Sequence, residues 1–312
     1  MHEQDNLDIA ARTVGPVAGG NTDTAVENGS PRSAAAEPPL MVIEPTPGWR
    51  LVNLGELWRY RELLFFLTWR DIKVRYKQTV LGLAWAVIQP VMAMVVFTIF
   101  FGKLGKLDQF TTAAYPIFVF AALIPWNFFG QAVSQSGQSL ITEANLLSKV
   151  YFPRLIIPCA SVGSLLVDFA VSFAVMLGLM VWYEVPPTLN LLMVPVLVLG
   201  TIFTALGAGT ILSALAVAYR DFRYMIPFMV QIWMFASPVA YPSNVVPERW
   251  RLVYAINPMA GIISGFRSAM LGDEHEPFQW GQMGVSFSVA VVLFLIGAFY
   301  FRRIERRFAD IV

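Results

Sequence analysis

Long apolar runs alternate with short polar segments along most of this chain. Runs without any charged residue occupy 81–101, 111–142, 185–219, 224–247 and 277–301, and a sixth run at 155–183 holds only one acid. A helix needs about 20 apolar residues to cross a bilayer. The runs therefore predict membrane spans at about 81–101, 114–136, 155–182, 188–218, 224–242 and 278–301. The expected fold class is an all-α, six-span polytopic membrane protein.

The region before the first apolar run reads as two parts. Residues 1–48 are rich in Ala, Gly, Pro and acids and show no apolar periodicity, which is typical of a disordered cytoplasmic tail. Residues 49–80 place apolar and charged side chains at helical spacing, and Asp71 and Arg75 form an expected i,i+4 pair. This stretch is too charged to span, so it predicts an N-terminal cytoplasmic helix in the membrane interface. Such a helix serves either as a plain anchor or as a surface for a partner.

Positive charge gathers at both ends of the span-bearing region. Seven basic residues lie between 50 and 77, and four lie between 302 and 307. Because basic residues concentrate in cytoplasmic loops, both termini, including the tail at 302–312, are expected in the cytoplasm, which requires an even number of spans. Lys103 and Lys106 fall outside in this arrangement and weaken it slightly. We therefore expect a multi-pass protein of the cytoplasmic, or inner, membrane that contacts lipids.

The loop at 143–154 is unlike an ordinary connection between spans. Its apolar residues at 146, 147, 150 and 151 fall on one helical stripe, opposite polar residues at 145, 148 and 149. This pattern predicts a short helix along the cytoplasmic face of the membrane. It can dock into another protein, or it can simply lie on the surface.

Two intramembrane features invite a functional interpretation. Asp168 is the one charged residue well inside a predicted span, and a buried acid in lipid suggests function by default. No other span offers Lys, Arg or His, so a structural hydrogen-bonded role competes with a coupling or gating role. Residues 257–272 are apolar but too short to cross, which predicts a re-entrant extracytoplasmic segment before the last span. Asn257, Pro258 and Arg267 are its candidate outer-gate residues; the alternative is a helix on the outer surface.

The residues needed for several other chemistries are missing from the sequence. The two histidines, His2 and His275, lie far from each other and from the single cysteine, Cys159, which reads as a small core residue. Neither Gly-Lys pair has the upstream glycine of a P-loop. The chain is therefore expected to bind no cofactor, no metal and no nucleic acid and to catalyse nothing. If transport is ATP-driven, another polypeptide supplies the ATPase.

In the fourth span, small residues recur at 201, 205, 209 and 213, which predicts close helix packing.

From about residue 49 to the carboxyl terminus, a series of short motifs follows the predicted topology. They are LTWRDIKVRYK at 67–77, LGLAW at 81–85 with Gln89-Pro90, LIPWN at 123–127, NLLSKVYFPR at 145–154, YRDF at 219–222, Ser237-Pro238, Asn257-Pro258, FRRIE at 301–305 and FAD at 308–310. In their order and topological positions, these motifs resemble the membrane permeases of ABC-type exporters that move polysaccharides, the O-antigen, capsule and teichoic-acid class.

The resemblance implies a homodimer of six-span subunits joined to two copies of a cytoplasmic ABC ATPase that binds ATP and Mg²⁺. It makes 143–154 the coupling helix. The residues implied to contact the ATPase are Glu143, Asn145, Lys149, Tyr151, Phe152, Pro153 and Arg154, with a second contact at Arg220, Asp221 and Phe222. The implied substrate is a lipid-linked glycan that moves outward along the subunit interface.

Aromatic side chains suit a path for a sliding sugar polymer, because sugars stack on aromatic faces. The candidates are Trp85, Phe97, Phe100, Trp126, Phe128, Phe129, Trp233 and Phe235, each of which also fits a packing or belt role.

Rival functions are an ABC exporter permease for a drug or lipid, an ATP-independent carrier or channel, and a membrane-embedded glycosyl- or acyltransferase. The carrier predicts intramembrane charge pairs or an inverted repeat, and the transferase predicts paired acids or a His-Asp set. The sequence offers neither pattern.

Overall fold

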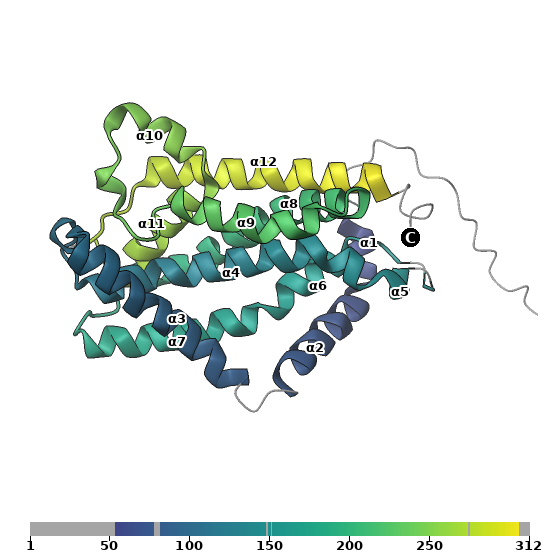
Figure 1. Ribbon diagram of the computed structural model, residues 1–312, viewed down its shortest axis with the longest axis horizontal. Helices are drawn as coiled ribbons and strands as arrows, with labels where there is room; N and C mark the ends of the chain where they lie inside the picture. Colours follow the sequence, from purple (N-terminus) through teal and green to yellow (C-terminus); the bar gives the residue numbers. More distant parts are fainter. Residues whose placement is uncertain (1–53, 78–81, 148, 151, 274, 306–312) are drawn as a thin grey trace, which may run out of the picture. The chain divides into compact units, whose positions relative to one another are not determined.

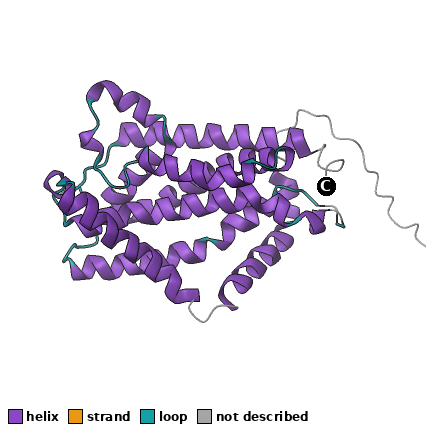
Figure 2. Ribbon diagram, in the orientation of Figure 1, coloured by secondary structure: helices purple, strands orange, loops and turns teal. Residues whose placement is uncertain are grey.

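The computed structural model describes residues 54–77, 82–147, 149–150, 152–273 and 275–305. The chain divides into two units, Met1–Thr46 and Pro47–Val312, and every described residue belongs to the second. The predicted tail at 1–48 lies outside the described residues. All regular elements in the described ranges are helical, as Figure 2 shows, so the all-α prediction is confirmed.

The helices are labelled in Figure 1. The longer ones are α2 (Arg61–Lys77), α3 (Gly82–Phe97), α4 (Tyr115–Thr142), α6 (Ile156–Ser164), α7 (Leu166–Trp182), α8 (Val194–Ala218), α9 (Phe222–Phe235), α10 (Glu248–Ala255), α11 (Pro258–Leu271) and α12 (Trp280–Glu305). The shorter ones are α1 (Leu54–Arg59), α5 (Ala144–Leu147), the π-helix η1 (Thr98–Leu104), and the 3₁₀ helices η2 (Leu107–Phe110), η3 (Leu189–Met193) and η4 (Ser243–Val245).

Five helical segments in the described ranges are long and apolar enough to cross a membrane. They are Ala84–Leu104, Tyr115–Thr142, Ile156–Trp182, Leu189–Ala218 and Trp280–Glu305. These segments correspond to the first, second, third, fourth and sixth predicted spans. The chain is therefore a multi-pass membrane protein.

The predicted span at 224–242 overlaps one helix, the 14-residue α9, which begins at Phe222. At 1.5 Å per residue such a helix is about 21 Å long, shorter than the roughly 30 Å hydrocarbon core. The helix stops shortly before Pro238, and Ser237 Oγ donates to the carbonyl of Trp233 at 2.9 Å. Proline disfavours helical backbone at the preceding residue and has no N–H to donate. Continuous helices in the described ranges thus provide five spans rather than six.

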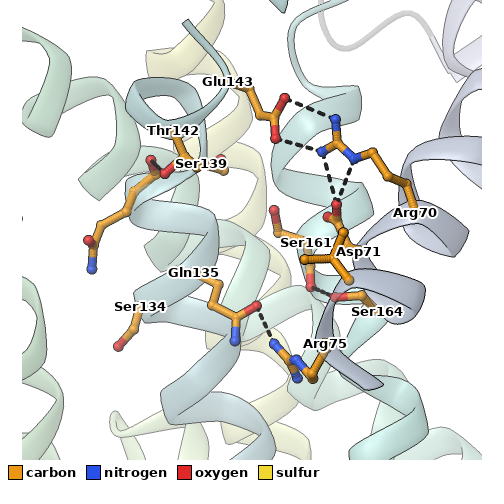
Figure 3. Close-up of a pocket in the computed structure, with 12 residues that line it drawn as sticks. Arg70, Asp71, Arg75, Ser134, Gln135, Ser139, Thr142, Glu143, Ser161 and Ser164 are labelled. Carbon is orange, nitrogen blue, oxygen red and sulfur yellow. Dashed lines mark hydrogen bonds and ion pairs between the residues drawn. The ribbon is translucent and has the colours of Figure 1, made fainter. Parts of the chain in front are cut away.

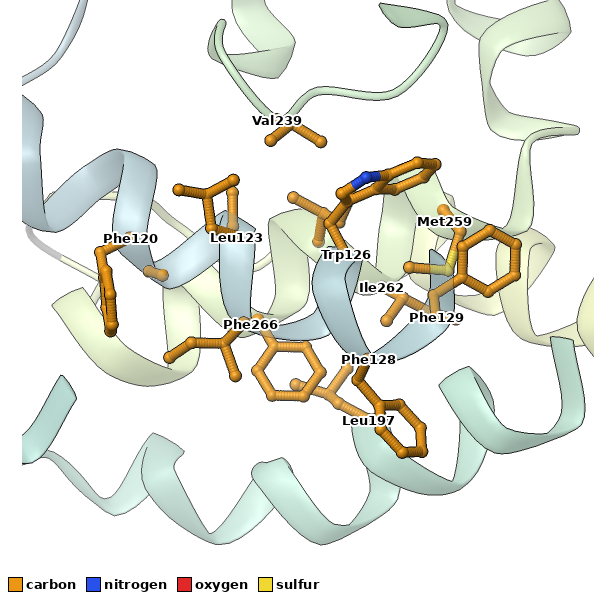
Figure 4. Close-up of a cluster of buried hydrophobic side chains, with 14 of the residues drawn as sticks. Phe120, Leu123, Trp126, Phe128, Phe129, Leu197, Val239, Met259, Ile262 and Phe266 are labelled. Atoms are coloured by element: carbon orange, nitrogen blue, oxygen red, sulfur yellow. The ribbon is translucent and has the colours of Figure 1, made fainter. Parts of the chain in front are cut away.

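Helix α4 forms the centre of the bundle. It packs against α3, α6, α7, α8, α9 and α11. Its Phe120 and Phe129 side chains are fully buried, and Figure 4 shows Phe129 beside Met259 of α11. Because lipid tails are as apolar as these side chains, tight van der Waals packing is what favours the assembly inside a membrane. The core of the protein therefore surrounds the second span.

Helix α8 packs closely between α4 and α12. The four small residues predicted to form a stripe, at 201, 205, 209 and 213, are all buried. A methyl group at Gly209 would overlap Ser136 Oγ of α4, and one at Gly207 would lie 2.7 Å from the Leu293 carbonyl carbon of α12. Small residues permit such close approach in membranes. The prediction of close packing along this span is confirmed.

Between α9 and α12 the chain forms η4, α10 and α11. All 14 residues of α11 are buried, against α4, α8 and α12 among others. The Asn257 side chain caps the helix by accepting from the backbone N–H of Met259 at 3.1 Å. Helix α11 is too short to cross a bilayer, and its enclosure by protein is what a re-entrant element requires. Its re-entrant position in the membrane stays a prediction.

The interfacial helix predicted at 49–80 is two helices in the described part, because a turn at Tyr60 separates α1 from α2. Helix α2 packs on α6, where a methyl at Gly163 would lie 3.2 Å from Thr68 Oγ1. Leu67 is buried, whereas Phe66 and Trp69 are exposed. Helix α2 is therefore apolar on two sides, one of which packs on protein.

Candidate functional site

The segment 143–154 joins α4 to α6. Its one helix in the described residues is α5, a single turn of four residues, so the predicted short helix is present at the start of the segment and does not extend to Val150. Residues 148 and 151 lie outside the described residues, and with them the predicted contact by Tyr151. Pro153 is partly buried, and its carbonyl accepts from the N–H of Ile156 at 3.0 Å. Pro153 therefore belongs to the turn that leads into α6.

Helix α2 holds the first residue of the segment. Glu143 accepts two hydrogen bonds from the Arg70 guanidinium, from Nη2 to Oε1 at 2.6 Å and from Nη1 to Oε2 at 3.1 Å. A two-pronged contact of this kind fixes orientation as well as distance. Arg70 Nε also donates to Asp71 at 3.1 Å. The hydrogen bond that Arg70 donates to Glu143 is the main cause that raises the pKa of Arg70, so the guanidinium stays charged.

The other end of the segment is held by α12 and by a second hydrophobic core. The Arg154 guanidinium donates to the carbonyl of Glu305 at 2.9 Å, and its backbone N–H donates to Glu305 Oε1 at 3.2 Å. The Phe152 side chain is only 4% exposed and packs in a cluster with Leu67, Leu140, Ile156, Ala214 and Phe301. The family resemblance implies that Phe152 contacts the ATPase. The structure instead buries it within its own chain.

The middle of the segment remains accessible. Asn145 and Lys149 are exposed, and Val150 is 52% exposed. The second predicted contact lies in the turn between α8 and α9, where Arg220 and Asp221 are exposed and Phe222 is partly buried. Because its ends are fixed and its middle is exposed, the segment can transmit a displacement of its middle to α2 and α12.

Asp168 lies in the first turn of α7 and is bound by α2. It forms an ion pair with Arg75 through Oδ2, and Oδ1 accepts a hydrogen bond from the Tyr76 hydroxyl. Arg75 Nη2 also donates to Gln135 Oε1 of α4 at 2.8 Å. Burial, and then the hydrogen bond to Asp168, raises the pKa of Tyr76, so this hydroxyl keeps its proton.

This arrangement changes two interpretations of the sequence. The spans supply no cationic partner for Asp168, as expected, but the helix before the first span does, which favours the structural role. The expected pair between Asp71 and Arg75 is wrong, because Arg70 binds Asp71 and Arg75 binds Asp168. One charge pair therefore joins α2 to the third span.

A polar cavity of about 630 Å³ lies between these contacts. Figure 3 shows its lining, with Arg70 facing Glu143 and Arg75 bound to Gln135. The walls come from α2, α4 and α6 and the end of α4 at Glu143. Hydroxyl, amide and charged side chains dominate, and Val74 is the one apolar side chain in the lining. The cavity thus touches both α2 and the start of the segment 143–154.

The aromatic candidates for a transport path divide into two groups. Trp126, Phe128 and Phe129 are buried in the main core, which favours packing. Phe97 and Trp233 are partly buried and pack against the same core, while Trp85, Phe100 and Phe235 are exposed. The exposed group is available to line a path or to meet lipid.

The candidate gate residues meet at one junction. Arg267 is fully buried, and its guanidinium donates to the carbonyls of Phe118 at 3.3 Å, Val239 at 2.9 Å and Tyr241 at 3.1 Å. It thereby joins α11, α4 and the loop after α9. Asn257 accepts from Trp233 Nε1 at 3.0 Å, and Pro258 is buried at the start of α11. These contacts fasten the junction; a gating role stays a prediction.

Sequence reasoning missed four residues of the site: Arg70, Arg75, Tyr76 and Gln135. All four are polar, and the three in α2 lie in the stretch LTWRDIKVRYK, whose positive charges predict topology. The available sign of an ion pair was the excess of arginine in this stretch together with one acid inside a predicted span. It did not say which arginine would reach Asp168.

The sequence matches one protein family and several named relatives. Residues 62–271 match the model of the family described as ABC-2 type transporter. The chain is 31% identical over 263 residues to the O-antigen export system permease protein RfbA of Myxococcus xanthus, covering 84% of this chain and 98% of that protein. It is 28% identical over 262 residues to RfbA of Klebsiella pneumoniae, covering 83% and 97%.

A more distant relative is the polysialic acid transport protein KpsM of Escherichia coli, 22% identical over 208 residues, which cover 65% of this chain and 78% of that protein. The resemblance to polysaccharide-exporter permeases is thereby confirmed. The family match covers α2 from residue 62, the segment 143–154 and Asp168, and it ends before Glu305 of α12. This chain belongs to the ABC-2 type transporter family.

Proposed function

We propose that this chain is the permease subunit of an ATP-driven exporter that moves a lipid-linked polysaccharide across the cytoplasmic membrane. The observation that carries the proposal is the 31% identity to an O-antigen export permease over 98% of that protein's length. Identity over nearly the full length argues for a shared overall task, beyond a shared helix. A separate ATPase subunit supplies the energy and holds ATP and Mg²⁺.

The segment 143–154 is the proposed contact with that ATPase. Its exposed middle at Lys149 and Val150 is accessible to a partner. Its two ends are bound to α2 through Arg70 and to α12 through Glu305. Movement of the segment would therefore pull on two distant helices together, which suits near-rigid motion of the whole subunit. Arg220, Asp221 and Phe222 form the second proposed contact.

The working unit is proposed to be a homodimer with two ATPase copies. In support, α3 and α9 each carry large apolar side chains that are exposed in the single chain, such as Trp85 at 58%, Phe228 at 64% and Phe235 at 61%. Lipid or a second subunit must cover them. In this arrangement both termini are cytoplasmic, α9 and the turns after it complete the fifth of six spans, and α11 is re-entrant.

A carrier that works without ATP is the rival that the site itself addresses. Such a carrier needs an acid that can bind and release a coupling ion. Asp168 is instead held by both Arg75 and Tyr76. This pairing supports a structural role for the acid and favours an external energy source.

The test is to delete the chain from its host and to measure surface polysaccharide and ATPase co-purification after adding back variants. We expect the wild-type chain to restore both. Lys149→Glu with Val150→Asp should lose both while the chain remains in the membrane. Lys103→Glu, an exposed lysine in η1, is the matched control and should behave as wild type. Full export by the double variant without bound ATPase would overturn the proposal.

A further inference from the structure

The cavity between α2, α4 and α6 has the size of a ligand site. Its volume of about 630 Å³ falls within the roughly 300–1,000 Å³ of typical small-molecule pockets. Eleven of the twelve residues that line it have polar or charged side chains, while carbon atoms make up most of the surface that faces the cavity. An occupant that carries both hydroxyl groups and C–H faces therefore fits this lining.

The hydrogen bonds already present show what the lining still offers. The hydroxyls of Ser139, Ser161 and Ser164 donate to backbone carbonyls of their own helices, which leaves their oxygens free to accept. Gln135 accepts from Arg75 through Oε1, so its NH₂ group remains a donor. The Gln138 amide makes no hydrogen bond to any residue that the structure describes. Donors and acceptors are thus interspersed.

The charges of the lining are balanced. Arg70 is bound by Asp71 and Glu143, and Arg75 is bound by Asp168. A phosphate group would meet arginines that already have carboxylate partners, and it would lie near two acids. A hydroxyl-rich, uncharged group meets no such repulsion, because each hydroxyl can both donate and accept.

We propose that this cavity binds an uncharged, hydroxyl-rich sugar unit of the exported polysaccharide. The proposal rests on the polysaccharide export proposed above and deepens it by naming a place and a chemical class. The Arg70–Glu143 pair forms part of the cavity wall and begins the segment 143–154. A bound sugar would therefore lie directly beside the contact that joins α2 to that segment.

Photo-cross-linking in the intact exporter tests this assignment. A benzoylphenylalanine at position 138 is placed in the full chain, together with its ATPase, in cells that make the polysaccharide. Position 66, on the exposed side of α2, is the matched control. We expect a glycan-bearing adduct of the chain from position 138 and none from position 66.

A second variant narrows the cavity itself. Ser134→Trp should reduce the position-138 adduct and surface polysaccharide about fivefold, the loss expected from about one hydrogen bond, while the ATPase still co-purifies. Adducts that carry only phospholipid, or normal export without any glycan adduct at 138, would overturn the proposal. If surface polysaccharide does not depend on the chain at all, the proposed function fails together with it.

Discussion

Arg70 of α2 holds Glu143 at the end of α4 through two hydrogen bonds of 2.6 and 3.1 Å. Glu143 begins the segment proposed to contact the ATPase, so this pair joins the helix before the first span to the point where force would enter. Fixing both oxygens of the carboxylate leaves the segment little freedom to rotate.

Exchanging the two charges tests whether the pair transmits coupling. Arg70→Glu alone would place three acids together with Asp71 and should lower export. The double variant Arg70→Glu with Glu143→Arg should recover part of the loss, with a coupling energy of about 1 kcal/mol, or roughly fivefold. Surface polysaccharide per unit of ATPase activity is the measurement. If the effect of the double variant equals the sum of the effects of Arg70→Glu alone and Glu143→Arg alone, a direct interaction is contradicted.

Removal of one partner from the Arg75–Asp168 pair should be worse than removal of both. Arg75→Leu leaves a half-buried carboxylate without its cation and should lower the free energy of unfolding by about 1–2 kcal/mol. Arg75→Leu with Asp168→Leu should lower it less, because no charge is left unpaired. Thermal unfolding in detergent, followed by tryptophan fluorescence, measures both. Equal melting temperatures for single and double variants would argue against the pairing.

Variants at Phe152 and Val150 should separate effects on folding stability from effects on ATPase binding. Phe152→Ala empties a position that is 4% exposed and should cost about 3 kcal/mol of stability. Val150→Ala should leave the melting temperature unchanged and weaken ATPase co-purification. If Phe152→Ala melts like wild type, the burial of this side chain is wrong.

Alanine variants of Gly207 in α8 and Gly178 in α7 provide a matched comparison between two spans. Gly207→Ala would place a methyl 2.7 Å from the α12 backbone and should destabilise the protein by about 1–3 kcal/mol. Gly178→Ala meets nothing within 4 Å and should be neutral or favourable, because alanine is the better helix former. Melting temperatures of the two variants are compared directly, and the opposite ranking would refute the close contact of α8 and α12.

The sequence was sufficient for features that depend on local pattern. Apolar length located five spans, and four-residue spacing of small residues located the packed face of α8. Both follow from helix geometry and from the thickness of a bilayer, and neither requires knowledge of which helices are neighbours.

Features that depend on distant pairing were not predictable in the same way. Arg75 and Asp168 are 93 positions apart, and the Arg70–Glu143 pair joins residues 73 positions apart. Nothing in the local pattern assigns one arginine of α2 to one acid. The short helix predicted within 143–154 is limited to α5, Ala144–Leu147. Beyond it, Phe152 packs inward and Arg154 binds α12, and an apolar stripe in the sequence does not predict these contacts.

The most direct test of the account is a cross-link from the middle of the segment 143–154 to the ATPase. Val150→Cys is introduced with Cys159→Ser, and the purified exporter is treated with a short cross-linker that reacts with a thiol at one end and is photoactivated at the other. Val253→Cys, exposed in α10, is the control. The account predicts a product joining the chain to the ATPase from position 150 and none from position 253. An actively exporting complex that gives no product from position 150 would contradict it.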